Sequence, residues 1–172
     1  MLRLNDLVEG MPAITPAFGQ YLAEAGAVCM ESQGHMQGQL LTVRGSHSGS
    51  YSVSWPDVTE QIRRCLNDPE VATEHGAVGI AVLLTKKLLG YTVIQRSRKG
   101  TGFDYWLGDD TELPFQNKAR LEVSGIRNGD SSIVRSRVRQ KRRQTDTSDE
   151  TRLPAHIVVV EFGKPIAEME QK

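Results

Sequence analysis

Two acidic residues lie in short strand-like segments, and their types and spacing suit metal-dependent hydrolysis. Asp104 lies in the glycine-flanked aromatic segment 100–107, and Glu122 lies in the segment 120–125. Side chains alternate between the two faces of a strand, so Glu122 and Ser124 are expected to point the same way. Two adjacent strands can then direct both carboxylates into one cleft. Carboxylate oxygens are the ligands that Mg²⁺ or Mn²⁺ prefers, and such an ion activates water and stabilises charge on a phosphodiester.

The composition fits one globular domain and does not by itself indicate a polyanion partner. The 172 residues suffice for a single domain, 1–172. Lys plus Arg and Asp plus Glu are balanced at 21 each, so a nucleic-acid role depends on how the charge is distributed. The chain has no apolar run of bilayer-spanning length, so neither secretion nor membrane insertion is expected. Cys29 and Cys65 lack metal-ligand spacing, which favours reduced thiols and a cytoplasmic setting.

Residues 1–69 are predicted to form an extension that precedes the acids. Its predicted elements are a helix over 17–32, hairpin strands over 39–44 and 51–55, and a short helix from an Asp57 cap to 64 or 65. We expect this extension to enlarge the sheet or to form a dimer surface.

The remaining chain predicts the order helix, three strands, helix, strand. The predicted elements are a helix over 70–89, strands over 91–96, 103–107 and 120–126, a helix over 131–144 and a strand over 156–162. The first helix is apolar around most of its circumference, so it is expected to pack on a sheet. The fold class is therefore α/β (α+β), with a central mixed sheet flanked by helices. The loops 44–50 and 145–153 and the last few residues are expected to be floppy.

This order of elements, with Asp104 and Glu122, resembles the restriction-endonuclease-like, or PD-(D/E)XK, nuclease superfamily. The resemblance covers 70–162 and implies a nuclease-like αβββαβ core at 70–165. It implies that Asp104 and Glu122 bind magnesium or manganese. It also implies an auxiliary acid on the first core helix, for which Glu74 is the candidate, turned inward.

Position 124 departs from the family pattern. A lysine stands two residues after the second acid in that family, whereas this chain has Ser124, whose hydroxyl is poorly suited to orient or deprotonate water. Members of the superfamily relocate this lysine, and Lys141 is the candidate because it is in helical register with Val134 and Val138, which precede it by seven and three residues. Gln144 resembles a glutamine that exonuclease-like branches carry on this helix.

The helix 131–144 carries six Lys or Arg residues and no Asp or Glu, so its charge is too dense to be balanced locally. A polyanion that bound these cations would release counterions, which favours DNA or RNA as the partner. The candidate phosphate-binding residues are Arg137, Arg139 and Arg142 on this helix, with Arg96, Arg98 and Lys99 beside the turn 100–102. The alternative is a solvated helix face that pairs with the acidic segment Asp146, Asp149 and Glu150.

Two functions follow from these observations. The leading hypothesis is a magnesium-dependent nuclease that cleaves phosphodiester bonds in DNA or RNA, as a homodimer or within a larger complex. The alternative is a catalytically inactive nuclease-fold subunit or adaptor that binds nucleic acid or a protein partner. The acids also have structural alternatives, in which Asp104 satisfies turn amides or pairs with an arginine such as Arg98, and Glu122 pairs with Arg120 or Arg96. If there is no metal site, the basic helix would be a surface for a protein partner. His75 is expected to have an ordinary solvent or core role.

Overall fold

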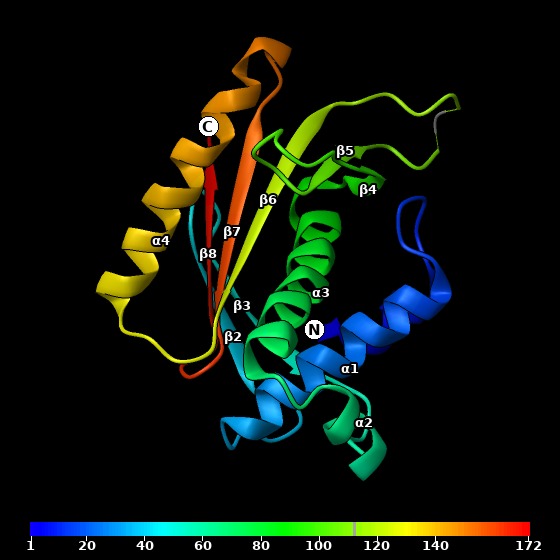
Figure 1. Cartoon of the computed structure of the whole chain (residues 1–172), viewed down its shortest axis with the longest axis vertical. Coiled ribbons are helices and arrows are strands. Elements are labelled where there is room, and N and C mark those ends of the chain that lie inside the picture. The colour runs from blue at the N-terminus through cyan, green and yellow to red at the C-terminus, as the bar shows by residue number, and fades with distance from the viewer. Residues whose placement is uncertain (112) are drawn as a thin grey trace.

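Eight strands form one mixed sheet in the computed structural model, which describes residues 1–111 and 113–172 (Figure 1). The strands, in chain order, are β1 (Leu2–Arg3), β2 (Leu40–Gly45), β3 (Gly49–Ser54), β4 (Thr92–Arg96), β5 (Tyr105–Gly108), β6 (Ala119–Ile126), β7 (Ala155–Glu161) and β8 (Ile166–Gln171). The helices are α1 (Pro16–Ser32), α2 (Glu60–Cys65), α3 (Pro69–Leu89) and α4 (Ser131–Gln144), with short 3₁₀ helices η1 (Leu4–Glu9) and η2 (Thr145–Thr151). The predicted class, a mixed sheet flanked by helices, is confirmed.

The second half of the chain follows the predicted order α3, β4, β5, β6, α4, β7. Strands β4, β5 and β6 pair antiparallel, and β7 then pairs parallel with β6. A parallel pair needs a crossover, which α4 supplies. The full order across the sheet is β1-β3-β2-β8-β7-β6-β5-β4.

Helix α3 packs inside, between the sheet and α1. The Asp68 carboxylate accepts hydrogen bonds from the amides of Glu70 and Val71 at 2.8 and 3.3 Å, and Gly90 ends the helix with a φ of 70°. Its apolar residues join one large core with α1 and one face of the sheet. No helix within 1–111 or 113–172 combines the length and apolar character needed to cross a membrane.

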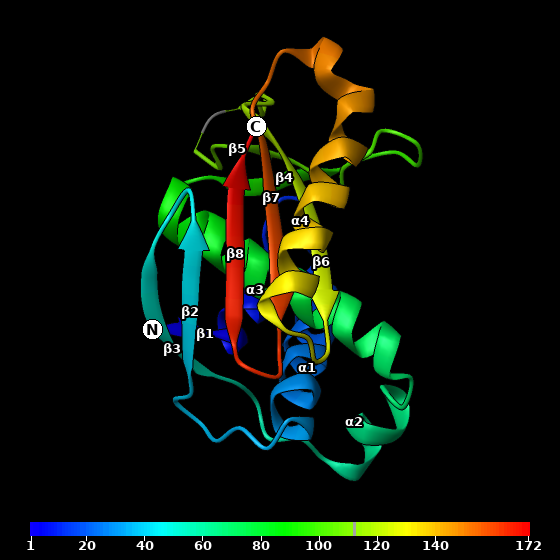
Figure 2. The same cartoon turned by 90° about the vertical axis from the view of Figure 1, so that its left-hand side faces the viewer.

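Helix α4 covers the opposite face of the sheet, as Figures 1 and 2 show. Its bounds agree with the prediction, and Asp130 caps it by accepting from the amides of Ser132 and Ile133. Val134 and Val138 lie in a second cluster of buried residues with Ile157 and Val159 of β7. These contacts fix the rotation of α4, and hence which of its cations face β6.

The C-terminal segment corrects one prediction. The last residues were expected to be floppy, but β8 pairs antiparallel with β7 and parallel with β2. It therefore joins the N-terminal hairpin to the rest of the sheet. The short β1, which pairs with β3, was also not predicted.

Two further predictions about local structure are wrong. The segment 145–153 contains η2, and the Arg120 guanidinium holds it through the Thr145 carbonyl and the Ser148 hydroxyl at 3.1 and 2.7 Å. A buried guanidinium needs such partners, so the segment is ordered. Helix α2 is capped by Thr59, whose hydroxyl accepts from Ile62, and not by Asp57.

Gly125 of β6 lies against α3, and we predict that an alanine here destabilises the fold by about 2 kcal/mol. A Cβ atom at 125 would lie 2.4 Å from the Thr73 carbonyl oxygen and 2.7 Å from Thr73 Cγ2. Urea denaturation of Gly125→Ala measures the loss. Adding Thr73→Ser removes only the methyl contact, so it should recover little. If this second substitution restored the full stability, the clash with the Thr73 carbonyl oxygen would not be the main cause of the loss.

Candidate functional site

Glu122 lies on the face of β6 that α4 covers. Arg120, Glu122 and Ser124 contact α4 or η2, whereas Leu121 and Val123 join the core on the α3 side, so the predicted alternation is confirmed. The Glu122 side chain is only 1% exposed. A carboxylate in this position needs partners that offset its lost hydration.

Two residues of α4 supply those partners. Lys141 Nζ lies 2.7 Å from Glu122 Oε1, and Gln144 Nε2 donates to the same oxygen at 3.0 Å. Lys141 Nζ also donates to Gln144 Oε1 at 3.3 Å. The structure thus brings together three of the predicted site residues. The pairing of Glu122 with Arg120 or Arg96, considered from the sequence, is replaced by this contact with Lys141.

Asp104 lies beside Glu122, at the start of β5. We expected it inside the strand, but β5 begins one residue later, at Tyr105. The backbone amide of Asp104 still donates to Leu121 at 2.8 Å, and its Oδ2 accepts from the Val123 amide at 2.8 Å. This side chain therefore bridges to β6, one residue from Glu122, instead of pairing with Arg98.

The two carboxyl groups perturb each other. Burial, reinforced by the Asp104 charge, raises the pKa of Glu122 to about 7 despite the opposing Lys141 ammonium. Burial also raises the pKa of Asp104, against the opposing hydrogen bond from the Val123 amide. Among the described residues, Lys141 is the cation that forms an ion pair with these acids, so two ionised carboxyls would share one direct ion-pair partner. Perturbed acids of this kind cluster at functional sites.

The donor set of this acid pair suits a divalent cation. Glu122 Oε2 is buried, and no donor among the described residues reaches it. Asp104 and Glu122 would hold Mg²⁺ or Mn²⁺ through carboxylate oxygens, which are the ligands that these ions prefer. Within 1–111 and 113–172, no cluster of three or more His, Cys, Asp or Glu side chains offers a complete protein cage. Two acids are sufficient where waters and substrate phosphates complete the coordination.

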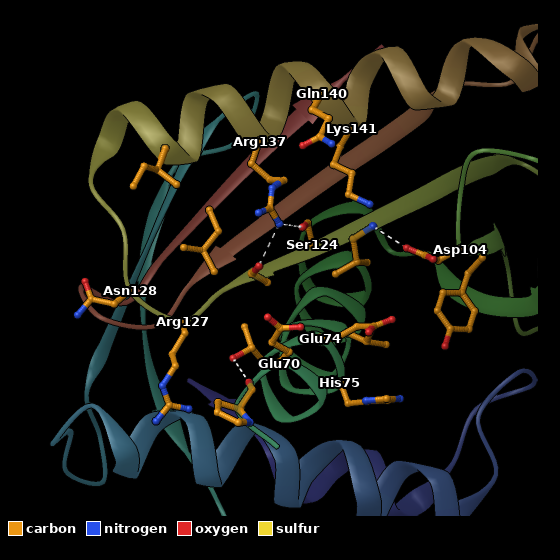
Figure 3. Close-up of a pocket in the computed structure, with 18 of the residues that line it drawn as sticks. Glu70, Glu74, His75, Asp104, Ser124, Arg127, Asn128, Arg137, Gln140 and Lys141 are labelled. Carbon is orange, nitrogen blue, oxygen red and sulfur yellow. Dashed lines mark hydrogen bonds between the residues drawn. The ribbon is translucent and has the colours of Figure 1, made fainter. Parts of the chain in front are cut away.

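The acid pair adjoins a cleft of about 970 Å³ between α4 and α3 (Figure 3). Asp104 and Lys141 line it, and Glu122 contacts Lys141 without lining the cleft itself. Figure 3 shows Arg137, Gln140 and Lys141 extending from α4, with Glu70, Glu74 and His75 on the opposite wall. The cleft therefore has a cationic wall and an acidic wall.

Ser124 and Glu74 do not join the acid pair. The Ser124 hydroxyl accepts a hydrogen bond from Arg137 Nη1 at 2.8 Å, so it orients an arginine. Glu74 was predicted to turn inward, but its side chain is exposed and lines the far wall of the cleft. Among the described residues, no hydrogen bond or ion pair links it to either acid.

The predicted phosphate-binding cations separate into different regions. Arg96 and Arg137 line the cleft, whereas Arg98 and Lys99 are exposed in the turn between β4 and β5. Arg139 and Arg142 lie on the other side of α4, in a groove that also contains Glu168 and Glu170.

The acidic segment after α4 has its own partners. Asp146 pairs with Lys172, and Asp149 pairs with Lys172 and Arg120. Asp146 and Asp149 therefore pair with residues outside α4, and not with the cations of that helix as the alternative from the sequence had it.

Several cleft residues were missed by sequence reasoning. Arg127 and Gln140 line the cleft, and Phe18 reaches it from α1. Arg127 had a detectable signal, because it directly follows the strand that carries Glu122. Phe18 had none, because its position depends on how α1 packs against α3.

Comparison of the chain with protein-family models, with curated proteins and with solved structures finds no match.

Proposed function

We propose that this protein is a divalent-metal-dependent nuclease of the restriction-endonuclease-like kind, which cleaves phosphodiester bonds in DNA or RNA. The observation that carries the proposal is the contact of Lys141 and Gln144 with Glu122, beside Asp104. Two acids and a lysine are the groups that this chemistry requires. In this chain α4 supplies the lysine that position 124 lacks.

Asp104 and Glu122 would hold the metal ion, which activates water and neutralises charge that develops on the phosphate. Gln144 fixes the Glu122 carboxylate by donating to Oε1. Lys141 has three N–H donors, of which two point to Glu122 and Gln144. The third can donate to the attacking water or to a phosphate oxygen.

Arg137 would bind the substrate phosphate. Its guanidinium lines the cleft and is oriented by the Ser124 hydroxyl and the Gly125 carbonyl at 2.8 and 3.3 Å. A preoriented guanidinium suits a phosphate because its planar donors match two phosphate oxygens at once. Ser124 then acts through Arg137 and not on the water.

The test combines metal binding with cleavage of labelled DNA and RNA, both single-stranded and duplex. We expect wild type to bind Mn²⁺ and to cleave at least one substrate in Mg²⁺. Asp104→Asn is expected to weaken Mn²⁺ binding by at least about tenfold, because one anionic ligand becomes neutral. Asp57→Asn, at an exposed residue, is the matched control. Mn²⁺ binding without cleavage of any substrate would instead favour the inactive subunit.

A further inference from the structure

Three aromatic side chains gather beside the cleft wall opposite α4. Phe18 and Tyr21 of α1 stack with centroids 6.5 Å apart and ring planes 16° apart. The His75 ring of α3 meets both edge-on, at centroid distances of 6.4 and 5.0 Å. Phe18 and His75 line the cleft and are half-buried, so part of each ring is available to a ligand.

The aromatic rings contact one another, and a hydrogen bond holds one of them. His75 Nδ1 lies 2.9 Å from the Val71 carbonyl of the preceding helical turn, which fixes the ring. Tyr21 packs behind Phe18 and His75. A fixed ring loses little conformational freedom when a planar group stacks on it. This wall therefore offers a preformed stacking surface.

The opposite wall supplies cations. Arg137 and Lys141 project into the cleft from α4, and Arg96 and Arg127 line its sides. Arg96 is held against Tyr105, with its guanidinium carbon 5.5 Å from the ring centroid. Cations along one side of a groove and aromatic rings along the other are how proteins bind unpaired nucleic acid, with phosphates on the cations and bases on the rings.

The size of the cleft favours the same ligand. Its 970 Å³ lies near the upper end of the roughly 300–1,000 Å³ that is usual for small-molecule sites. Such a space suits a few nucleotides. In a duplex the bases are paired and stacked on each other, so their faces could not reach Phe18 or His75.

We infer that the cleft takes an unpaired nucleic-acid strand, with its phosphates along α4 and its bases against Phe18 and His75. The inference rests on the proposed function, which supplies the phosphodiester ligand. It adds a substrate class, and it assigns His75 a binding role that sequence reasoning had not given it.

The test measures binding by fluorescence anisotropy in EDTA, so that no cleavage occurs. The probes are a labelled mixed-sequence DNA strand of about 12 nucleotides, its blunt duplex, and an abasic strand of equal length. The variants are Phe18→Leu, which keeps an apolar side chain, and His75→Gln, which keeps a polar one. Phe115→Leu, at an exposed phenylalanine outside the cleft, is the matched control.

We expect the single strand to bind at least about tenfold more tightly than the duplex. Phe18→Leu and His75→Gln are each expected to weaken single-strand binding by about 5-fold to 100-fold, and to leave abasic-strand binding unchanged. Equal or tighter binding of the duplex would overturn the inference. So would unchanged single-strand affinity in both variants, provided that their circular dichroism matches wild type.

Cleavage assays separate this inference from the proposed function. Single-strand binding of the expected pattern, with no cleavage of any substrate, would contradict the nuclease and support the inference. Cleavage confined to duplex DNA or duplex RNA would support the nuclease and overturn the inference.

Discussion

Replacing Lys141 by methionine is expected to slow phosphodiester cleavage by at least about 100-fold, the usual scale for a group that assists proton transfer or stabilises developing charge. Methionine keeps the apolar stem and removes the ammonium. The loss would appear in kcat, because the ammonium acts on the water and the phosphate during the reaction. Cleavage of the preferred labelled substrate in Mg²⁺, followed at saturating substrate, measures it.

Metal binding distinguishes a catalytic Lys141 from a structural one. Removing the ammonium removes a competitor for Glu122 Oε1, but it also raises the pKa of Glu122 further. The two effects oppose each other, so at a pH of about 8 to 9 we expect Mn²⁺ affinity to change by less than about tenfold. A large loss of Mn²⁺ affinity that accounts for the lost cleavage would assign Lys141 a supporting role only.

Two further variants sharpen the experiment. Arg139→Met removes one positive charge from the other side of α4, so it should leave kcat nearly unchanged. Lys141→Arg keeps the charge but cannot give up a proton near neutral pH. Recovery with arginine would indicate charge stabilisation, whereas failure to recover would indicate proton transfer. Cleavage by Lys141→Met within about threefold of wild type would contradict the proposed role.

The second prediction concerns the stability of the metal-free protein. The pKa of Glu122 is about 7 in the fold, against 4.5 for an ordinary glutamate, so the folded state binds this proton more tightly than the unfolded state does. The stabilisation is fully present below a pH of about 4.5 and is lost as the pH rises through about 7. At about 1.4 kcal/mol per pKa unit, the loss over the whole range is about 3.5 kcal/mol.

Glu122→Gln removes the pH-dependent contribution of Glu122 to stability, because glutamine does not titrate. Between pH values of about 5 and 8, the unfolding free energy of wild type should fall by about 3 kcal/mol relative to that of the variant. Urea denaturation in EDTA at several pH values provides the measurement. Glu150→Gln, at an exposed glutamate, should run parallel to wild type. A constant difference between Glu122→Gln and wild type across this range would mean that Glu122 keeps an ordinary pKa.

The sequence predicted which sides of β6 and α4 face each other, because the residue pattern of both elements repeats clearly. Alternation along β6 placed Glu122 and Ser124 on one face, and the spacing of seven and three residues from Val134 and Val138 placed Lys141 on the buried side of α4. Both inferences depend on local geometry that a neighbouring element cannot easily override. The placement of Lys141 near the acids was therefore accessible without coordinates.

The sequence interpretation treated the arginines of α4 as one block, whereas the structure places them on different sides of the helix. Arg137 lies one turn before Lys141 and shares its side of the helix, whereas Arg139 and Arg142 are three residues apart and share another side. The helical repeat alone was enough to predict that these arginines lie on different sides of α4. The contact between Arg137 and Ser124 did not follow from the period, because it depends on the distance between α4 and β6.

The β8 strand was missed because its amino-acid composition favours a helix. Residues 166–171 read Ile-Ala-Glu-Met-Glu-Gln, which is rich in helix formers. Pairing with β2 and β7 makes this segment a strand, because strand formation depends strongly on the neighbouring strands. The inward position of Glu74 failed for a related reason, because the rotation of α3 is set by its packing partners.

The place of β8 in the sheet also sets an order of events during synthesis. Hairpin β2–β3 is made early, yet β8, through which it joins the rest of the sheet, follows the other described strands in the chain. Local pairs such as β2 with β3 form quickly, whereas contacts between segments distant in the chain form slowly. Until β8 pairs with β2 and β7, one edge of each of these strands is unpaired, and such edges promote association with other chains. A chain in which β8 has not yet paired would therefore have two open sheet edges, and it should need protection from aggregation until β8 joins them.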